Sequence, residues 1–181
     1  MKKIITLFII MFSFFTKGNA QYDQLATDLT FKSVDGNNIN INNYKNKVLV
    51  VVNVASRCGF TNQYEDLQKL WSTYKDKGLV VIGVPSDNFR QEPGSNKEIK
   101  DFCETNFGID FPITEKMDVI GDSAHPFFLW AKENYGSSAI PKWNFHKIVI
   151  GRNGKVSDTF ASITNPSSNK FISSIEKEIK N

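Results

Sequence analysis

One cysteine stands where a protein chain can make a thiol reactive. Cys58 follows Val48–Val54, a nearly unbroken apolar run of strand length, and precedes a segment with helical spacing. In an open α/β sheet, ligands bind in the loops at the carboxyl ends of strands. The positive end of a helix dipole and the neighbouring Arg57 both favour the thiolate, which is the nucleophilic form. The alternative interpretation of Cys58 is a buried structural cysteine.

The residues after Cys58 narrow the chemistry that this thiol can do. A thioredoxin-type redox pair needs Cys-x-x-Cys, and Thr61 stands where the second cysteine would be. A single activated thiolate is suited to attack an electrophile such as a peroxide, which converts the thiolate to a sulfenic acid. A second thiol must then reduce that sulfenic acid, either Cys103 in the same chain or an external one.

Composition and the remaining polar residues exclude several other classes of protein. The chain has 181 residues, 40% apolar and 23% charged, which is ordinary for one globular domain. It is therefore neither a disordered chain nor a disulfide-dense small protein. Two cysteines and two histidines, His125 and His146, lack the close spacing of a zinc site. We expect no metal and no organic cofactor.

Strands and helices alternate along the chain around Cys58. Hydrophobic periodicity and turn signals predict these elements. The expected extended segments are Leu29–Ser33 and Ile39–Ile41 as a hairpin, Val48–Val54, Leu79–Val84, and a second hairpin of Phe145–Ile150 with Val156–Phe160. The expected helices are Tyr64–Tyr74, Asn96–Phe107 with Asn96 as a cap, His125–Tyr135 and Ser168–Lys180.

The order of these elements predicts the fold. Consecutive buried strands joined by a helix imply parallel pairing, whereas the late hairpin adds antiparallel strands. We therefore expect an α/β protein with a thioredoxin-like fold. Its mixed central sheet is flanked by helices, and a β-hairpin precedes it at the N-terminus. We assign residues 21–181 to this single domain.

The first twenty residues have the pattern of a secretory signal peptide. A basic start is followed by the apolar run Ile4–Phe15 and by small residues that end at Ala20, the expected cleavage site. An uncleaved membrane anchor is the alternative, although the run is shorter than the ~20 residues that span a bilayer. Cleavage removes three lysines and no acid from the 22 basic and 19 acidic residues. The remaining net charge is near zero, which gives no reason to expect nucleic acid as a partner. From the signal peptide we expect an exported protein, periplasmic or secreted, without a stable membrane span.

Three motifs carry a resemblance to a known family. The segment 53–61, Asn-Val-Ala-Ser-Arg-Cys-Gly-Phe-Thr, is similar to the signature of the glutathione peroxidases around their catalytic cysteine or selenocysteine. The segment 83–94 resembles the second motif of that family, and Lys142-Trp143-Asn144-Phe145 resembles the third. Because the three motifs occur in the family's order and the resemblance covers most of the chain after residue 28, it is specific.

The resemblance implies a catalytic tetrad of Cys, Gln, Trp and Asn. Cys58 would take the peroxidatic role, while Trp143 and Asn144 would donate hydrogen bonds to the thiolate and the departing hydroxide. Outside this motif, a tryptophan is more often a core aromatic and an asparagine more often a turn or a cap. This sequence differs from the family's pattern at the position of the glutamine. Asn88 occupies its place in the aligned motif, and the loop is one residue shorter, so Gln91 is the alternative. We predict Asn88.

The second cysteine, Cys103, resembles the resolving cysteine of the thioredoxin-dependent, non-selenium members. That role needs a disulfide, with Cα atoms ~4.4–6.8 Å apart. A cysteine inside a separate helix does not meet this distance easily, so we expect the helix to unwind in part. The alternative is an inert cysteine on the buried face of the helix.

These observations predict a thiol peroxidase that protects against oxidative stress. It would reduce hydrogen peroxide or organic hydroperoxides and be reduced in turn by a thioredoxin-like protein or by glutathione. The short interval between Pro126 and Trp143 lacks room for the family's assembly loop, which implies a monomer. The alternatives are a peroxide sensor or redox relay that oxidises a partner protein, and a non-catalytic binding module on the same fold.

Overall fold

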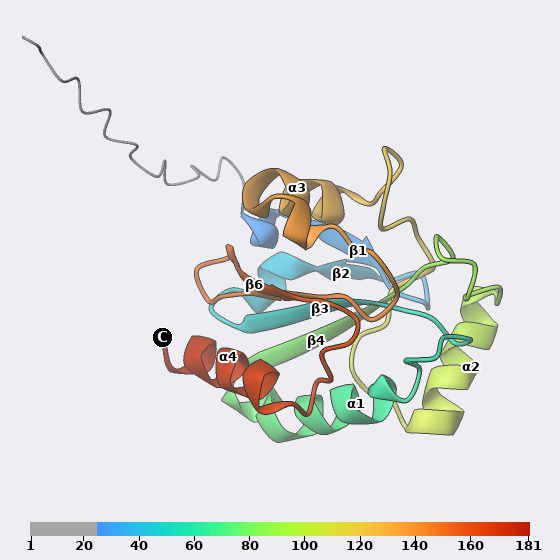
Figure 1. Cartoon of the computed structure of the whole chain (residues 1–181), viewed down its shortest axis with the longest axis horizontal. Coiled ribbons are helices and arrows are strands. Elements are labelled where there is room, and N and C mark those ends of the chain that lie inside the picture. The colour runs from blue at the N-terminus through green and yellow to red at the C-terminus, as the bar shows by residue number, and fades with distance from the viewer. Residues whose placement is uncertain (1–24) are drawn as a thin grey trace, which may run out of the picture.

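A four-stranded mixed sheet forms the centre of the molecule (Figure 1). The computed structural model describes residues 25–181, so the predicted signal peptide lies outside the described residues. The strands are β3 (Val48–Val54), β4 (Leu79–Pro85), β5 (Lys147–Ile150) and β6 (Val156–Phe160), in the spatial order β4-β3-β5-β6. β3 pairs parallel with β4, and β5 pairs antiparallel with both β3 and β6. The predicted mixed sheet is therefore confirmed.

Elements on both faces of the sheet explain why β3 and β4 are so apolar. The helices α1 (Gln63–Tyr74), α2 (Asn96–Phe107) and α4 (Asn169–Lys180) contribute to the hydrophobic cluster on one face. The helix α3 (Pro126–Tyr135) and the antiparallel hairpin of β1 (Thr30–Lys32) and β2 (Asn38–Asn40) pack against the other (Figure 1). Every residue of β3 and β4 is buried, as expected of strands that are covered on both sides. Short 3-10 turns complete the described elements at Ala26–Asp28, Ile41–Tyr44, Lys75–Lys77 and Ser137–Ala139.

Both ends of α2 are capped, but not as the sequence suggested. We expected Asn96 to cap the helix, whereas Ser95 does so in a capping box with Glu98. At the other end Gly108 adopts the left-handed conformation, with φ 58°, and its N–H reaches the carbonyl oxygens of Cys103 and Glu104. The N–H of Ile109 also donates to the Cys103 carbonyl, at 3.3 Å. The helix therefore ends in an αL-type C-cap that also involves the Cys103 carbonyl oxygen.

The strand β5 begins at Lys147, two residues later than predicted. Phe145 has a φ of 64°, which no residue of a regular strand adopts. Its N–H donates a 2.6 Å hydrogen bond to the carbonyl oxygen of Asn53 in β3. The chain from Trp143 to His146 is thus a turn fastened to the end of β3, not the start of a strand. Among residues 25–181, no helix has the length and apolar character to cross a membrane.

Candidate active site

Cys58 lies in a tight turn between β3 and α1. Cys58 is 8% exposed, and its carbonyl oxygen accepts a 3.0 Å hydrogen bond from the N–H of Thr61. The Thr61 hydroxyl accepts from the Cys58 N–H at 3.1 Å and lies 3.0 Å from the carbonyl oxygen of Ala55. Thr61, which stands where a second redox cysteine would be, thus stabilises the turn. The turn brings Cys58 back toward the end of β3.

One backbone donor is directed at the sulfur of Cys58. The N–H of Phe60 lies 3.4 Å from Cys58 Sγ, within hydrogen-bonding distance for sulfur. A Cβ at Gly59 would meet no atom within 4 Å, so the fold does not require a glycine there on steric grounds. A hydrogen bond to the charged form of a group stabilises that form. The turn therefore supports the thiolate with a fixed donor.

The turn that carries Trp143 and Asn144 is held by Asn53. The Asn53 side chain donates from Nδ2 to the Trp143 carbonyl oxygen at 3.2 Å, and its Oδ1 accepts from the N–H of His146 at 3.0 Å. Asn53 is fully buried near the end of β3, five residues before Cys58. Sequence reasoning did not single out Asn53. The available signal was a polar residue that interrupts an otherwise apolar buried strand.

Asn144 and Trp143 face different surroundings. Asn144 is fully buried, and its Nδ2 donates a 2.8 Å hydrogen bond to Gln91 Oε1. The Asn144 Oδ1 atom is buried without a hydrogen-bond partner among the described residues. Trp143 is 41% exposed, and its ring packs against Phe89 with centroids 5.4 Å apart. The motif therefore places an amide inside the protein and an indole at its surface.

Gln91, not Asn88, joins the loop of Cys58 to Asn144. The Gln91 carbonyl oxygen accepts a 3.0 Å hydrogen bond from the N–H of Arg57, and its side chain holds Asn144. Between the two candidate amides, Arg90 takes a left-handed conformation with φ 57°. This tight turn carries Gln91 toward the site although the loop is one residue shorter than expected. An alignment by residue type does not reveal that turn.

The Asn88 side chain is occupied elsewhere. Its Oδ1 accepts from the N–H of Val119 at 2.6 Å and from that of Ile120 at 3.3 Å, and its Nδ2 donates to Asp118 at 2.9 Å. These bonds fasten the loop after β4 to the segment before α3. The Asn88 amide is thus committed to that segment, an arrangement that favours Gln91, the alternative for the site amide.

Glu92 fixes the other side of the Cys58 loop. The carboxylate accepts hydrogen bonds from the Ser56 N–H at 2.8 Å and from the Ser56 hydroxyl at 2.7 Å. Glu92 is 1% exposed, and burial raises the pKa of its carboxyl above the ordinary value, against the hydrogen bonds from Ser56 that lower it. Sequence reasoning missed Glu92 as well. A buried carboxylate bound to Ser56, two residues before Cys58, keeps the loop in one conformation.

Cys103 lies on the buried face of α2, and both cysteines are free thiols. The two belong to the same hydrophobic cluster. Burial raises the pKa of the Cys103 thiol to about 11, although the nearby Tyr64 hydroxyl acts in the opposite direction. That hydroxyl is itself buried and has no hydrogen-bond partner among the described residues. In this conformation Cys103 is therefore a protonated, poorly nucleophilic thiol at neutral pH.

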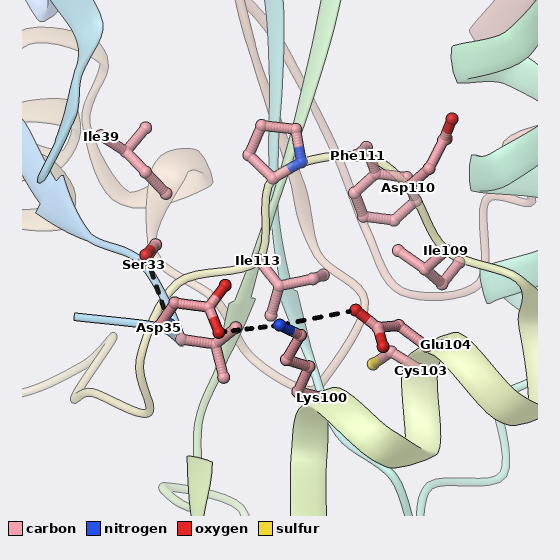
Figure 2. Close-up of a pocket in the computed structure, with 12 residues that line it drawn as sticks. Ser33, Asp35, Ile39, Lys100, Cys103, Glu104, Ile109, Asp110, Phe111 and Ile113 are labelled. Carbon is pink, nitrogen blue, oxygen red and sulfur yellow. Dashed lines mark hydrogen bonds and ion pairs between the residues drawn. The ribbon is translucent and has the colours of Figure 1, made fainter. Parts of the chain in front are cut away.

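A cavity opens beside Cys103, on the side of α2 toward the N-terminal hairpin (Figure 2). It has a volume of about 270 Å³, and Cys103, Phe111 and Ile113 are among the residues that line it. Lys100 crosses it with ion pairs to Asp35 at 2.8 Å and to Glu104 at 3.8 Å. The packing around Cys103 is thus incomplete on one side.

Comparisons with known proteins identify relatives over most of the chain. The model of the family described as glutathione peroxidase matches residues 26–132. The glutathione peroxidase-like peroxiredoxin 2 of Saccharomyces cerevisiae is 44% identical over 78% of this chain and 90% of its own length. The hydroperoxy fatty acid reductase gpx1 of Synechocystis is 40% identical over 87% of this chain and 98% of its own. The crystal structure of Trgpx in apo form superposes with a TM-score of 0.70 and 34% identity, covering 88% of this chain and 97% of that one.

Proposed function

The chain belongs to the glutathione peroxidase family and is a thiol peroxidase, and we propose that Cys58 is the thiol that attacks peroxide. One observation carries this assignment. Gln91 binds Arg57 through its backbone and Asn144 through its side chain, and so joins three segments that are distant in sequence around the Cys58 loop. A merely structural cysteine needs no such convergence of amides, nor the donor from Phe60.

The reaction at Cys58 transfers one oxygen atom. The thiolate sulfur attacks one oxygen of a hydroperoxide ROOH, and the O–O bond breaks as the S–O bond forms. The products are a sulfenic acid on Cys58 and RO⁻, which takes a proton to leave as ROH, water when R is hydrogen. Sulfur is oxidised and peroxide is reduced by two electrons. The residues around Cys58 therefore need to stabilise a thiolate before the attack and an oxyanion during it.

Amide and indole donors supply that stabilisation. We assign the glutamine role to Gln91 instead of Asn88, because the Gln91 amide is already bound to Asn144. Asn144 is buried beside it, and Trp143 offers its indole N–H from the surface of the same turn. Donors that are fixed before the reaction stabilise developing charge without the cost of reorienting water.

Cys103 is proposed to resolve the sulfenic acid. The Cys103 thiolate attacks the sulfenic sulfur of Cys58, a disulfide forms, and the hydroxyl leaves as water once it takes up a proton. The raised pKa of Cys103 and its place inside α2 both oppose this step in the described conformation. We therefore propose that the end of α2 opens first, which exposes the thiol to solvent and lets it reach Cys58.

The proposed substrates and reductants follow from the names of the relatives. One relative is named a hydroperoxy fatty acid reductase and another a peroxiredoxin. We propose that this chain reduces hydrogen peroxide and organic hydroperoxides, and that a thioredoxin-like dithiol protein reduces its disulfide in preference to glutathione. We further propose that it acts as a monomer after export and without a metal or organic cofactor.

The deciding experiment counts thiols after one equivalent of peroxide. Fully reduced residues 21–181 are mixed with hydrogen peroxide, quenched at short times and measured by intact mass, with Cys103→Ser and Cys58→Ser as matched variants. We expect the wild type to lose both thiols to a Cys58–Cys103 disulfide, Cys103→Ser to gain one oxygen, and Cys58→Ser to react no faster than free cysteine. If Cys58 in the wild type also reacts no faster than free cysteine, the peroxidatic assignment is refuted. Full turnover of Cys103→Ser with thioredoxin would refute the resolving role alone.

A further inference from the structure

Lys147 is a buried cation without an acidic partner. It opens β5, and its side chain is fully buried. Its Nζ donates to Gln63 Oε1 and, at 2.6 Å, to the carbonyl oxygen of Thr164. Neither acceptor is charged, and the ion pairs found within residues 25–181 do not include Lys147. Burying an ammonium group among neutral partners is costly, so its retention calls for a physical explanation.

The partner of Lys147 leads directly to the Cys58 turn. Gln63 is the first residue of α1 and is 5% exposed. Its side chain is fixed at both ends, because Oε1 accepts from Lys147 while Nε2 donates to the carbonyl oxygen of Ser162 at 2.7 Å. Its own N–H donates to the Phe60 carbonyl oxygen at 2.9 Å. Gln63 is thus one of the points at which the turn is attached to the rest of the fold.

Phe60 completes the connection to the sulfur. Its carbonyl oxygen is held by Gln63, and its N–H points to Cys58 Sγ at 3.4 Å. Three successive hydrogen bonds therefore run from the Lys147 ammonium through Gln63 and Phe60 to the thiol. The turn of Trp143 and Asn144 immediately precedes Lys147 in the chain. The same lysine consequently connects the Cys58 turn to the strand that directly follows the turn of the other proposed site residues.

We infer that Lys147 is a positioning residue for the peroxidatic thiol: through Gln63 it holds the Phe60 N–H against Cys58 Sγ. This inference rests on the proposed role of Cys58. Without the ammonium, Gln63 Oε1 has no donor in the core, the side chain can turn away, and the start of α1 is released from β5. The Phe60 donor then loses its fixed direction, and the thiolate loses a hydrogen bond that it needs before it attacks.

Alkylation of Cys58 tests the inference without using peroxide. In a Cys103→Ser background, the rate of reaction with iodoacetamide is measured across about pH 5 to 10, a range that brackets ordinary thiol ionisation. Lys147→Met and Gln63→Met each remove one partner at similar side-chain length, and the double variant closes a mutant cycle. Arg152→Met is the matched control, because Arg152 is a half-buried cation that donates to the backbone carbonyl oxygens of Asn46 and Ile179 and makes no contact with the Cys58 turn.

The expected result is a loss of about tenfold in alkylation rate at neutral pH for each single variant. The double variant should be no slower than either single one, because both act through one connection. Arg152→Met should lower thermal stability and leave the profile in place. If Lys147→Met does not fold, Gln63→Met is judged by the same criterion.

Three results would overturn the positioning role. The first is an unchanged pH profile of Cys58 alkylation in the single variants. The second is a double variant in which the two losses of alkylation rate multiply, and the third is an equal loss of rate in Arg152→Met. Failure of the proposed function looks different. The parent protein would then fail to consume peroxide, whether or not Lys147→Met changes alkylation.

Discussion

Replacing Gly108 by alanine should accelerate the formation of the Cys58–Cys103 disulfide. Gly108 ends α2 with φ 58°, and a Cβ there would meet no atom within 4 Å. The substitution therefore adds no clash, and its cost is that of a left-handed alanine, about 1 kcal/mol. The αL-type C-cap that this cost weakens includes the carbonyl oxygen of Cys103. If opening of α2 precedes resolution, a destabilisation of about 1 kcal/mol raises the open population roughly fivefold, and the rate of disulfide formation rises by the same factor.

The assay separates the two chemical steps. Reduced Gly108→Ala is mixed with one equivalent of hydrogen peroxide, and acid-quenched samples are resolved by mass into thiol, sulfenic acid and disulfide. Loss of the Cys58 thiol should keep its wild-type rate, since the Cys58 turn is untouched. Gly121→Ala serves as the control, because Gly121 has φ 80° with an equally open surrounding but lies in the loop before α3. A disulfide rate in Gly108→Ala that equals or falls below that of the wild type would show that α2 need not open.

Three further outcomes follow from the site. Gln91→Ala should slow peroxide consumption about 10²-fold in a single-turnover assay, as the loss of an oriented hydrogen-bond donor does in other enzymes. A loss below about threefold would contradict the assignment of the glutamine role to Gln91. Asn88→Ala should leave that rate within about twofold but cost about 1–3 kcal/mol in urea denaturation, because the N–H groups it serves lose their acceptor. Burial lowers the pKa of Lys147 to about 7, so the unfolded chain binds more protons above that pH. The urea midpoint should consequently rise from pH about 7 upward more steeply in the wild type than in Lys147→Met, and parallel curves would contradict the burial effect.

The elements of the fold could be predicted from sequence because local patterns encode them. The apolar run of β3 is buried at every position, as expected of a central strand. The periodic apolar residues of α4 likewise face the core. Pairing between distant strands was not accessible in this way. No sequence pattern within β3 or β5 predicts that the two strands pair, because their contact depends on how the whole chain packs.

The candidate site was harder to predict at the level of single side chains. Residue types predicted Cys58, and the family resemblance predicted Trp143 and Asn144. The choice between Asn88 and Gln91 depended on the left-handed Arg90, a backbone state that composition does not specify. Asn53 was overlooked for a related reason. Its role consists of hydrogen bonds to the backbone of a turn some 90 positions away in sequence. Such contacts exist only once the sheet has formed.

The burial of Cys103 inside α2 limits the peroxide concentration that this protein can withstand. On the proposed mechanism, disulfide formation is a first-order event within one molecule, and its rate does not depend on the peroxide concentration. Further oxidation of the Cys58 sulfenic acid to a sulfinic acid consumes a second peroxide and accelerates in proportion to its concentration. The ratio of the two rate constants defines a concentration above which molecules inactivate before they resolve. A more tightly capped α2 would therefore make the enzyme more fragile under heavy oxidant load, even as it made the fold more stable.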